Sequence, residues 1–240
     1  MTLNGQATEQ SDTPSALSAL PPRDASALVR TVRDRLRQAI LFGELTAGTR
    51  LNQVKVAEQL GVSRMPVRTA SADLVAEGLL EPIATGGVAV RPLTQEDVLR
   101  AYEVREALEA GAAKEAARRQ PAAAIDEVFA ILDQHSELGG ANDIARLAEL
   151  DRAFHSAILN STDNPYYSRA MVPMWSVVER AMIGMLQQVP GMFKLSWEQH
   201  RGIAEAVRDG EVELAEARVH EHLSHAADAL IQAFALQQTD

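Results

Sequence analysis

The N-terminal part of the chain repeats hydrophobic residues at the spacing of amphipathic helices. This spacing predicts helices over residues 25–43, 52–61 and 66–78, because residues three and four apart share one face of a helix. Residues 79–93 instead alternate apolar residues around Gly86-Gly87, which is typical of a β-hairpin. Three helices, the last two joined by a tight glycine turn, followed by a hairpin predict a winged helix-turn-helix.

The pattern changes at residue 94, after which helical spacing continues to the end of the chain. Six further helices are predicted, and no strand pattern follows residue 92. The breaks between them include Gly139-Gly140, Asn164-Pro165, Pro190-Gly191 and Gly210. Helices joined by short connections pack antiparallel, so this half predicts an all-α antiparallel helical bundle. The expected fold class is therefore mainly α, a winged helix-turn-helix followed by a helical bundle.

These patterns divide the chain into a polar tail at residues 1–24, which we expect to be disordered, and two domains at 25–92 and 93–240. The N-terminus lacks the basic start and apolar core of a secretory signal. No apolar run approaches the roughly 18 residues that cross a bilayer. We therefore expect a soluble cytoplasmic protein. The absence of cysteine excludes disulfides, zinc–thiolate sites and thiol nucleophiles.

Charge is distributed unevenly between the two domains. Residues 25–92 carry nine Lys and Arg against six Asp and Glu, whereas residues 93–240 carry thirteen against twenty-four. A basic module joined to an acidic one indicates two tasks, of which the basic module favours a polyanion.

Two arginines occupy the start of the third predicted helix. Arg64 and Arg68 are four residues apart, so they share one face at the position of a recognition helix. A guanidinium group can donate to O6 and N7 of guanine together, which contributes about 1–3 kcal/mol of discrimination. The alternative is that both are ordinary surface charges. The surrounding helix-turn-helix and hairpin pattern favours contact with DNA.

The predicted bundle carries four polar residues that could meet. Asp151 and His155 are four residues apart on one helix, while His200 and His222 lie at similar distances before and after the Gly210 turn. One carboxylate and three imidazoles predict a divalent metal site, with zinc favoured and nickel, manganese or iron acceptable. On a six-coordinate metal, four protein ligands leave two positions open. We interpret His135, His220 and His225 as surface or outer residues.

Arg105 could point into the same cavity. A buried guanidinium beside an open metal would hold a carboxylate by a charge-assisted pair. The alternative is a salt bridge between Arg105 and Glu106 or Glu109. Methionines and a tryptophan at helical spacing between Met171 and Met185 predict core, part of which could also line a ligand cavity.

With these motifs in view, residues 25–237 resemble the GntR family of transcription regulators, FadR-type subgroup. The run from "AILFGELTAGTRL" to "LGVSRMPVR" and "AEGLL" is similar to the family's winged helix. Asp151, His155, His200 and His222 match the pattern of its helical effector-binding domain, called FCD. The resemblance implies a dimer that binds operator DNA and responds to a small carboxylate in a metal-containing pocket, with Arg105 in that pocket.

The sequence departs from the family pattern at several positions, among them Thr69 and Ser71, which replace part of the usual Glu-Ala-Leu. Met65 stands where the family usually has Thr or Ser, so an apolar contact to a thymine methyl would replace a polar one. Gly86 stands where an arginine is frequent, which leaves backbone amides to meet phosphate at the wing. Gln199 replaces Glu beside His200, which would remove an outer hydrogen-bond acceptor. The predicted DNA contacts are Arg64, Met65, Arg68, Arg33, Arg37, Arg50, Lys55, Gly86 and Gly87.

The leading hypothesis is a dimeric DNA-binding repressor whose bundle binds a divalent metal and a small carboxylate effector. Effector binding would favour one arrangement of the two domains. The rival is a metal-dependent hydrolase or lyase acting on a small organic acid, although no general base or nucleophile is evident and the winged helix would be unexplained. A purely structural metal would instead be four-coordinate with no open position.

Overall fold

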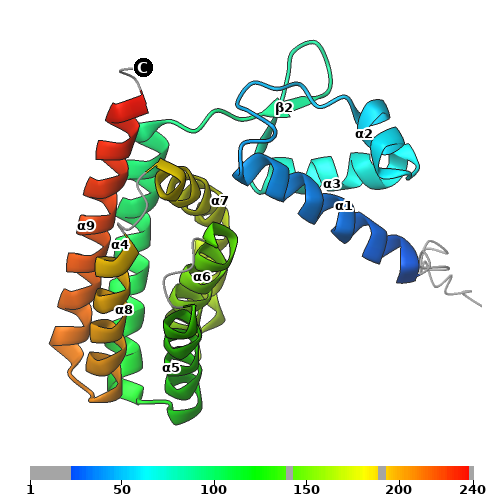
Figure 1. The fold of residues 1–240 in the computed structure, drawn as a ribbon. Coiled ribbons are helices and arrows are strands. Elements are labelled where there is room, and N and C mark those ends of the chain that lie inside the picture. The colour runs from blue at the N-terminus through cyan, green and yellow to red at the C-terminus, as the bar shows by residue number, and fades with distance from the viewer. Residues whose placement is uncertain (1–22, 139–142, 189–192, 238–240) are drawn as a thin grey trace, which may run out of the picture.

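A computed structural model describes residues 23–138, 143–188 and 193–237 of this chain. Within these ranges it contains nine helices and one two-stranded sheet (Figure 1). The elements are α1 (Arg23–Leu41), α2 (Gln53–Leu60), α3 (Arg64–Ala76), β1 (Leu80–Pro82), β2 (Val88–Val90), α4 (Gln95–Arg119), α5 (Ala122–Glu137), α6 (Ile144–Asn160), α7 (Pro165–Gln188), α8 (Phe193–Arg208) and α9 (Val212–Gln237). The predicted fold class is confirmed.

The N-terminal domain is built on the packing of α1 against α3. Val32 and Leu36 from α1 and Val67 and Leu74 from α3 are buried in its core. The turn between α2 and α3 begins at Gly61, whose φ of 65° is a conformation that glycine adopts without strain. β1 and β2 pair antiparallel, with Leu80 opposite Val90, and form the predicted hairpin.

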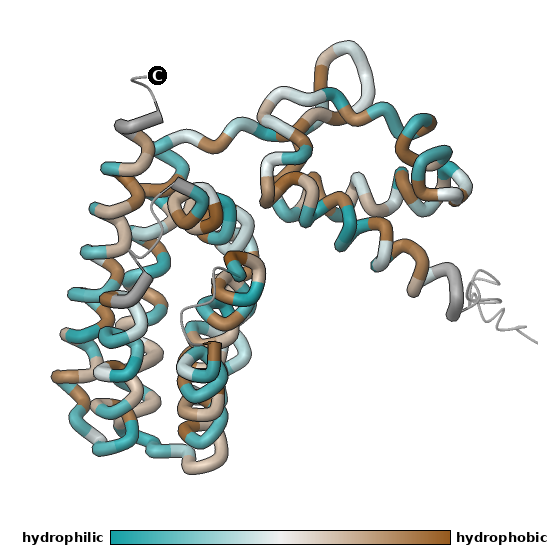
Figure 2. The backbone as a smooth tube through the Cα atoms, in the orientation of Figure 1, coloured by the Kyte–Doolittle hydropathy of each residue, from teal (hydrophilic) through white to brown (hydrophobic). Residues whose placement is uncertain are grey.

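The C-terminal domain is an antiparallel bundle in which α4 packs along α9, and α8 lies against α9 (Figure 1). Fully buried Ala112, Ala113 and Ala116 give α4 a narrow face, which allows close helix packing. Thr94 and Asp97 form a capping box at the start of α4. Figure 2 shows hydrophobic and hydrophilic stretches alternating along the long bundle helices, which is the pattern of amphipathic packing.

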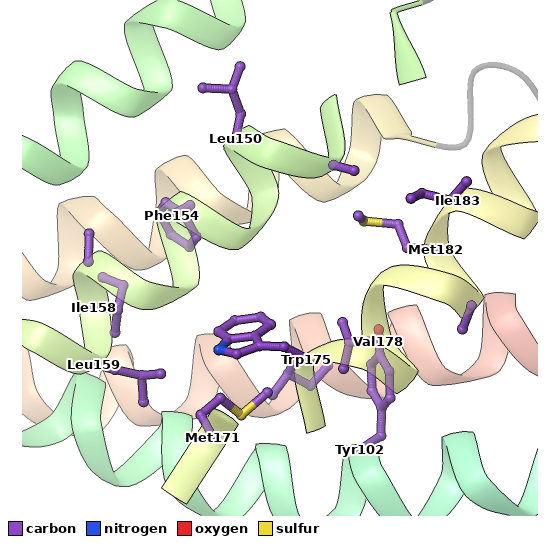
Figure 3. Packing of buried hydrophobic residues seen from close by; sticks show 14 of the residues in the cluster. Tyr102, Leu150, Phe154, Ile158, Leu159, Met171, Trp175, Val178, Met182 and Ile183 are labelled. Atoms are coloured by element: carbon purple, nitrogen blue, oxygen red, sulfur yellow. The ribbon is translucent and has the colours of Figure 1, made fainter. Parts of the chain in front are cut away.

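The bundle core joins α6 to α7. Phe154, Ile158 and Leu159 from α6 lie among the same buried cluster as Met171 and Trp175 from α7 (Figure 3). The methionine and tryptophan series of α7 is therefore core, as its helical spacing predicts. This packing fixes the face of α6 on which Asp151 and His155 are placed.

Most of the predicted helix boundaries agree with the structure to within two residues. Breaks occur at Asn164-Pro165 and at Gly210, whereas those predicted at Gly139-Gly140 and Pro190-Gly191 lie outside the described residues. Residues 1–22 of the predicted tail also lie outside them, and α1 takes in Arg23 and Asp24. In the described part of the chain, no helix combines the length and apolar character needed to cross a membrane.

The two domains touch where α1 meets α7. Glu179 of α7 lies at this contact with only 7% of its side chain exposed. Its carboxylate accepts a hydrogen bond from Arg152 of α6 at 2.8 Å and pairs with Arg37 of α1. Arg37 also donates to Glu77 at 3.3 Å. One carboxylate thus links a helix of each domain.

Candidate functional site

Three histidines from α6, α8 and α9 converge inside the bundle. The Nε2 atom of His200 lies 3.1 Å from Nε2 of His155 and 3.2 Å from Nε2 of His222. All three side chains are buried. The Gly210 turn brings α8 and α9 together antiparallel, which explains why residues 200 and 222 lie at the same height.

Asp151 borders this histidine cluster, which we define as His155, His200 and His222. Its Oδ1 atom lies 3.8 Å from Nε2 of His155 and 3.7 Å from Nε2 of His200. Asp151 is itself buried, and burial raises the pKa of its carboxyl. The structure thus brings the four residues that the sequence singled out into one place.

Aromatic side chains hold the central imidazole. The ring of His200 stacks on Phe154 with centroids 4.1 Å apart, and Trp197 meets it edge-on at 4.8 Å. Such packing restricts the rotamer of His200 and aims its Nε2 atom at the other two imidazoles. The ring of His135 stacks on Trp197, with the ring centroids 3.8 Å apart. His135 therefore supports the cluster from outside, through Trp197.

The convergence of three Nε2 atoms fits a bound cation. Neutral imidazoles cannot all direct lone pairs at one point favourably, because like partial charges repel at about 3 Å. Burial lowers the pKa of His200 and His222, with neighbouring histidines adding to the effect, so both favour the neutral form that ligates metal. Among the described residues, the three histidines form a group whose ligand atoms lie within 4.8 Å of one another.

Glu109 of α4 is a residue that the sequence reasoning considered only as a salt-bridge partner. Its Oε2 atom lies 2.6 Å from Nδ1 of His155, and its Oε1 accepts from Nε of Arg105 at 2.6 Å. A hydrogen bond from Nδ1 leaves the Nε2 lone pair of His155 facing the cluster. The spacing of Arg105 and Glu109 was the available signal, but an i, i+4 pair does not reveal its burial.

The Arg105–Glu109 pair is almost completely buried. Burial alone would raise the pKa of Glu109, but Arg105 and His155 outweigh it and hold that pKa at about 2. Arg105 also donates from Nη1 to the hydroxyl of Tyr102 at 3.1 Å. Its Nη2 is buried and has no hydrogen-bond partner among the described residues. The predicted salt bridge between Arg105 and Glu109 is therefore present, and one guanidinium nitrogen is left over from it.

A cavity of about 120 Å³ adjoins the histidine cluster. Arg105, Asp151 and His222 line it together with Gln199 and apolar side chains of α7 and α9. The sequence suggested that Gln199, in place of Glu, would remove an outer hydrogen-bond acceptor. In the structure, Gln199 still provides one. Its Oε1 lies 3.2 Å from Nδ1 of His222, and its Nε2 lies 2.7 Å from Nδ1 of His225. The amide oxygen can accept from His222 as a carboxylate would.

A second set of residues forms an exposed face on the N-terminal domain. Arg64, Met65 and Arg68 project from the first turns of α3 and are exposed, Met65 by 56%. Neither arginine has an ion pair or side-chain hydrogen bond within the described part of the chain. Val67 of the same helix is buried and anchors α3 to the core. The exposed face is therefore free to contact a partner.

The hairpin, or wing, carries further predicted contact residues. Arg50 donates from Nη2 to the backbone oxygen of Gly86 at 2.9 Å, so its guanidinium sits at the tip of the hairpin. Gly86 and Gly87 adopt φ values of 85° and 92°, which explains the two glycines in this turn. Lys55 is exposed on α2.

Two predicted DNA contacts on α1 are placed differently. Arg37 lies at the domain junction, bonded to Glu77 and Glu179, so its predicted contact with phosphate does not fit this position. Helical spacing put Arg37 off the apolar stripe but could not show that the bundle covers it. Arg33 is half-buried and pairs with Asp34 at 2.8 Å.

Both the N-terminal and the C-terminal domain match families of known proteins. Residues 28–90 match the family "Bacterial regulatory proteins, gntR family", and residues 100–225, more than half of the chain, match the FCD domain. The chain belongs to the GntR family. This GntR-family protein is 31% identical over 195 residues to the "Probable D-xylose utilization operon transcriptional repressor" of Paenarthrobacter nicotinovorans, covering 80% of this chain and 84% of the relative.

Further relatives agree with this assignment of the GntR-family protein. It is 31% identical over 210 residues to "HTH-type transcriptional regulator LutR" of Bacillus subtilis (strain 168), covering 78% of this chain and 94% of LutR. The structure of E. coli McbR/YncC has the same fold, with a TM-score of 0.74 at 21% identity over 86% of this chain and 98% of that one.

Membership of the GntR family decides between the predicted functions. The family consists of bacterial regulatory proteins. The relatives and structural neighbours are transcription regulators and not enzymes, so the hydrolase or lyase alternative is rejected. FCD domains commonly bind metal, and the histidine cluster lies within the matched FCD residues.

Proposed function

We propose that this protein is a dimeric GntR-family repressor whose FCD domain binds a divalent metal, with zinc favoured and nickel, manganese or iron as alternatives, and a small carboxylate effector. The observation that carries the proposal is the convergence of three buried Nε2 atoms beside a cavity. Asp151, His155, His200 and His222 would hold the metal. Because operator DNA is the target, we expect the protein to act in the cytoplasm.

The bound metal would supply a Lewis acid that accepts a carboxylate oxygen. The side chains of this chain do the rest of the recognition. Arg105 directs its unpartnered Nη2 donor toward the same anion, while Glu109 fixes both the guanidinium and the His155 ring. The adjoining cavity leaves room for a ligand, which favours a sensory site over a purely structural metal.

The proposed DNA interface consists of the exposed face of α3 and the wing. Arg64 and Arg68 would contact base edges or phosphates in the major groove, and Met65 would meet a thymine methyl. Arg50 brings a cation to the wing where Gly86 has no side chain to offer, and Gly87 has no side chain that would keep a phosphate away from the backbone. Lys55 and Arg33 would supply phosphate contacts.

Arg68→Ala tests the DNA-binding half of the proposal. Loss of one good guanidinium contact should weaken operator binding by about 1–3 kcal/mol, or roughly 5–150-fold. Fluorescence anisotropy would measure this on a duplex selected from a random library by the wild-type protein. Arg30→Ala, which removes an exposed arginine of α1 outside the proposed interface, should cost less affinity. Wild-type binding by Arg68→Ala would remove Arg68 from the interface.

Zinc addition tests the metal half. Protein stripped with a chelator should gain about 2.7 kcal/mol of stability when free zinc reaches 100 times its dissociation constant. The gain should appear as a higher midpoint of thermal unfolding and should disappear when the chelator is restored. If zinc, nickel, manganese and iron all leave the midpoint unchanged, the cluster is not a metal site.

A further inference from the structure

The cavity beside the histidine cluster has one cationic corner and an otherwise largely apolar wall. Arg105 is its only lysine or arginine among the described lining residues. Beyond the cluster, much of the wall consists of Met182, Met185, Leu195, Ala226, Ala229 and Leu230. A ligand that fills the cavity must therefore place its anionic group at Arg105 and an uncharged portion against these side chains.

The fixed charges of the site limit the charge of the ligand. Arg105 contributes one positive charge, and Glu109 and Asp151 contribute one negative charge each. Imidazoles that ligate a metal do so in the neutral form, and burial raises the pKa of Tyr102 to about 12, so its hydroxyl carries no charge. With a divalent ion in place, the site carries a net charge of plus one, which a single carboxylate neutralises.

Two further groups near the cluster are already engaged elsewhere. Glu179 is already matched by Arg37 and Arg152 at the domain junction. His225 lines the cavity but is exposed, and its Nδ1 is taken up by Gln199. Ser196, Gln199 and His225 also line the cavity. A second carboxylate that lay instead against the methionine and aliphatic side chains would have no cationic partner there, which is costly in a buried site.

We propose that the effector is a monocarboxylate with a short uncharged, apolar chain, and that the cavity rejects dicarboxylates. This inference rests on the proposed metal and carboxylate function and deepens it. The acid group pairs with the guanidinium of Arg105 at the metal corner, and the chain packs on Met182, Met185 and Leu230. The volume of about 120 Å³ restricts the chain to a few carbon atoms.

Pentanoate and glutarate are matched probes, because they share five carbons and differ only in the terminal group. Isothermal titration of zinc-loaded full-length protein should show pentanoate binding at least about tenfold more tightly than glutarate. Equal or tighter binding of glutarate would overturn the inference while leaving a carboxylate site in place. If neither acid binds although zinc does, the effector half of the proposed function fails too.

A new cation in the apolar wall should weaken the preference for pentanoate over glutarate. Met185→Lys places an ammonium group on the inner wall of the cavity. Leu195→Lys places one on a lining residue that is already 57% exposed, so this substitution should not disturb folding. Each should narrow the preference for pentanoate at least about tenfold. Met185→Leu, the matched uncharged control, should retain it. If both lysine variants fold, bind zinc and still reject glutarate at the wild-type ratio, the charge argument is wrong.

Discussion

Glu109→Ala is expected to destabilise the protein by about 3–5 kcal/mol at pH 7. The substitution leaves the guanidinium of Arg105 buried without its countercharge and deprives Nδ1 of His155 of its partner. An unpaired buried charge costs far more than the pair contributed, because the protein interior screens it poorly. Urea unfolding followed by circular dichroism would measure the loss.

The same helix offers a matched control. Glu115 pairs with Arg119 at 2.6 Å, also four residues apart, but this pair is exposed to solvent. Glu115→Ala should therefore change stability little. Similar losses for the two variants would show that burial of the Arg105–Glu109 pair does not have the importance assigned to it.

Acid should abolish the advantage of the wild type over Glu109→Ala. The pKa of Glu109 is depressed in the folded state, so its stabilisation is present above the unfolded value of about 4.5 and is lost as pH falls toward about 2. The difference in free energy of unfolding should shrink across this window. A difference that stays constant from pH 6 to pH 2 would contradict the ionised pair.

His200→Ala is expected to weaken zinc binding by more than about 100-fold, beyond the 10–100-fold typical of changes to outer partners of a metal ligand. His200 is the imidazole that lies close to both others, so its loss removes the central donor. Competition with a chromophoric chelator would give the dissociation constant.

Two variants bracket this effect. His220→Ala removes an exposed histidine of α9 that pairs with Glu106 and should leave zinc affinity unchanged. Gln199→Leu removes only the acceptor for His222 and should cost about 10–100-fold. Wild-type zinc affinity in His200→Ala would refute the ligand assignment.

The elements of this fold could be predicted from sequence because each is amphipathic and bounded by glycine, proline or a cap. The meeting of His200 with His222 was predictable as well, since Gly210 reverses the chain midway between them. These inferences need only local periodicity and one turn.

What the sequence could not show depends on which surfaces cover each other. Arg37 sits off the apolar stripe of its helix, as an exposed arginine would, yet α7 packs over it. Glu109 and Glu115 occupy similar pairs on one helix, but α6 buries only the first through His155. Gln199 lacks the charge of the usual residue and still presents an acceptor, because the neighbouring helix brings His222 within reach.

The carboxylate of Glu179 has a consequence for motion of the whole molecule. It is shared by Arg37 of the DNA-binding domain and by Arg152, the residue next to Asp151 on α6. A rotation of the DNA-binding domain away from the bundle would separate Arg37 from Glu179. The nearly buried carboxylate would then keep only Arg152 as a cationic partner. The ion pairs of Glu179 therefore couple the orientation of the DNA-binding domain to the position of α6, the helix that carries Asp151. A displacement of either one changes the free energy of the other.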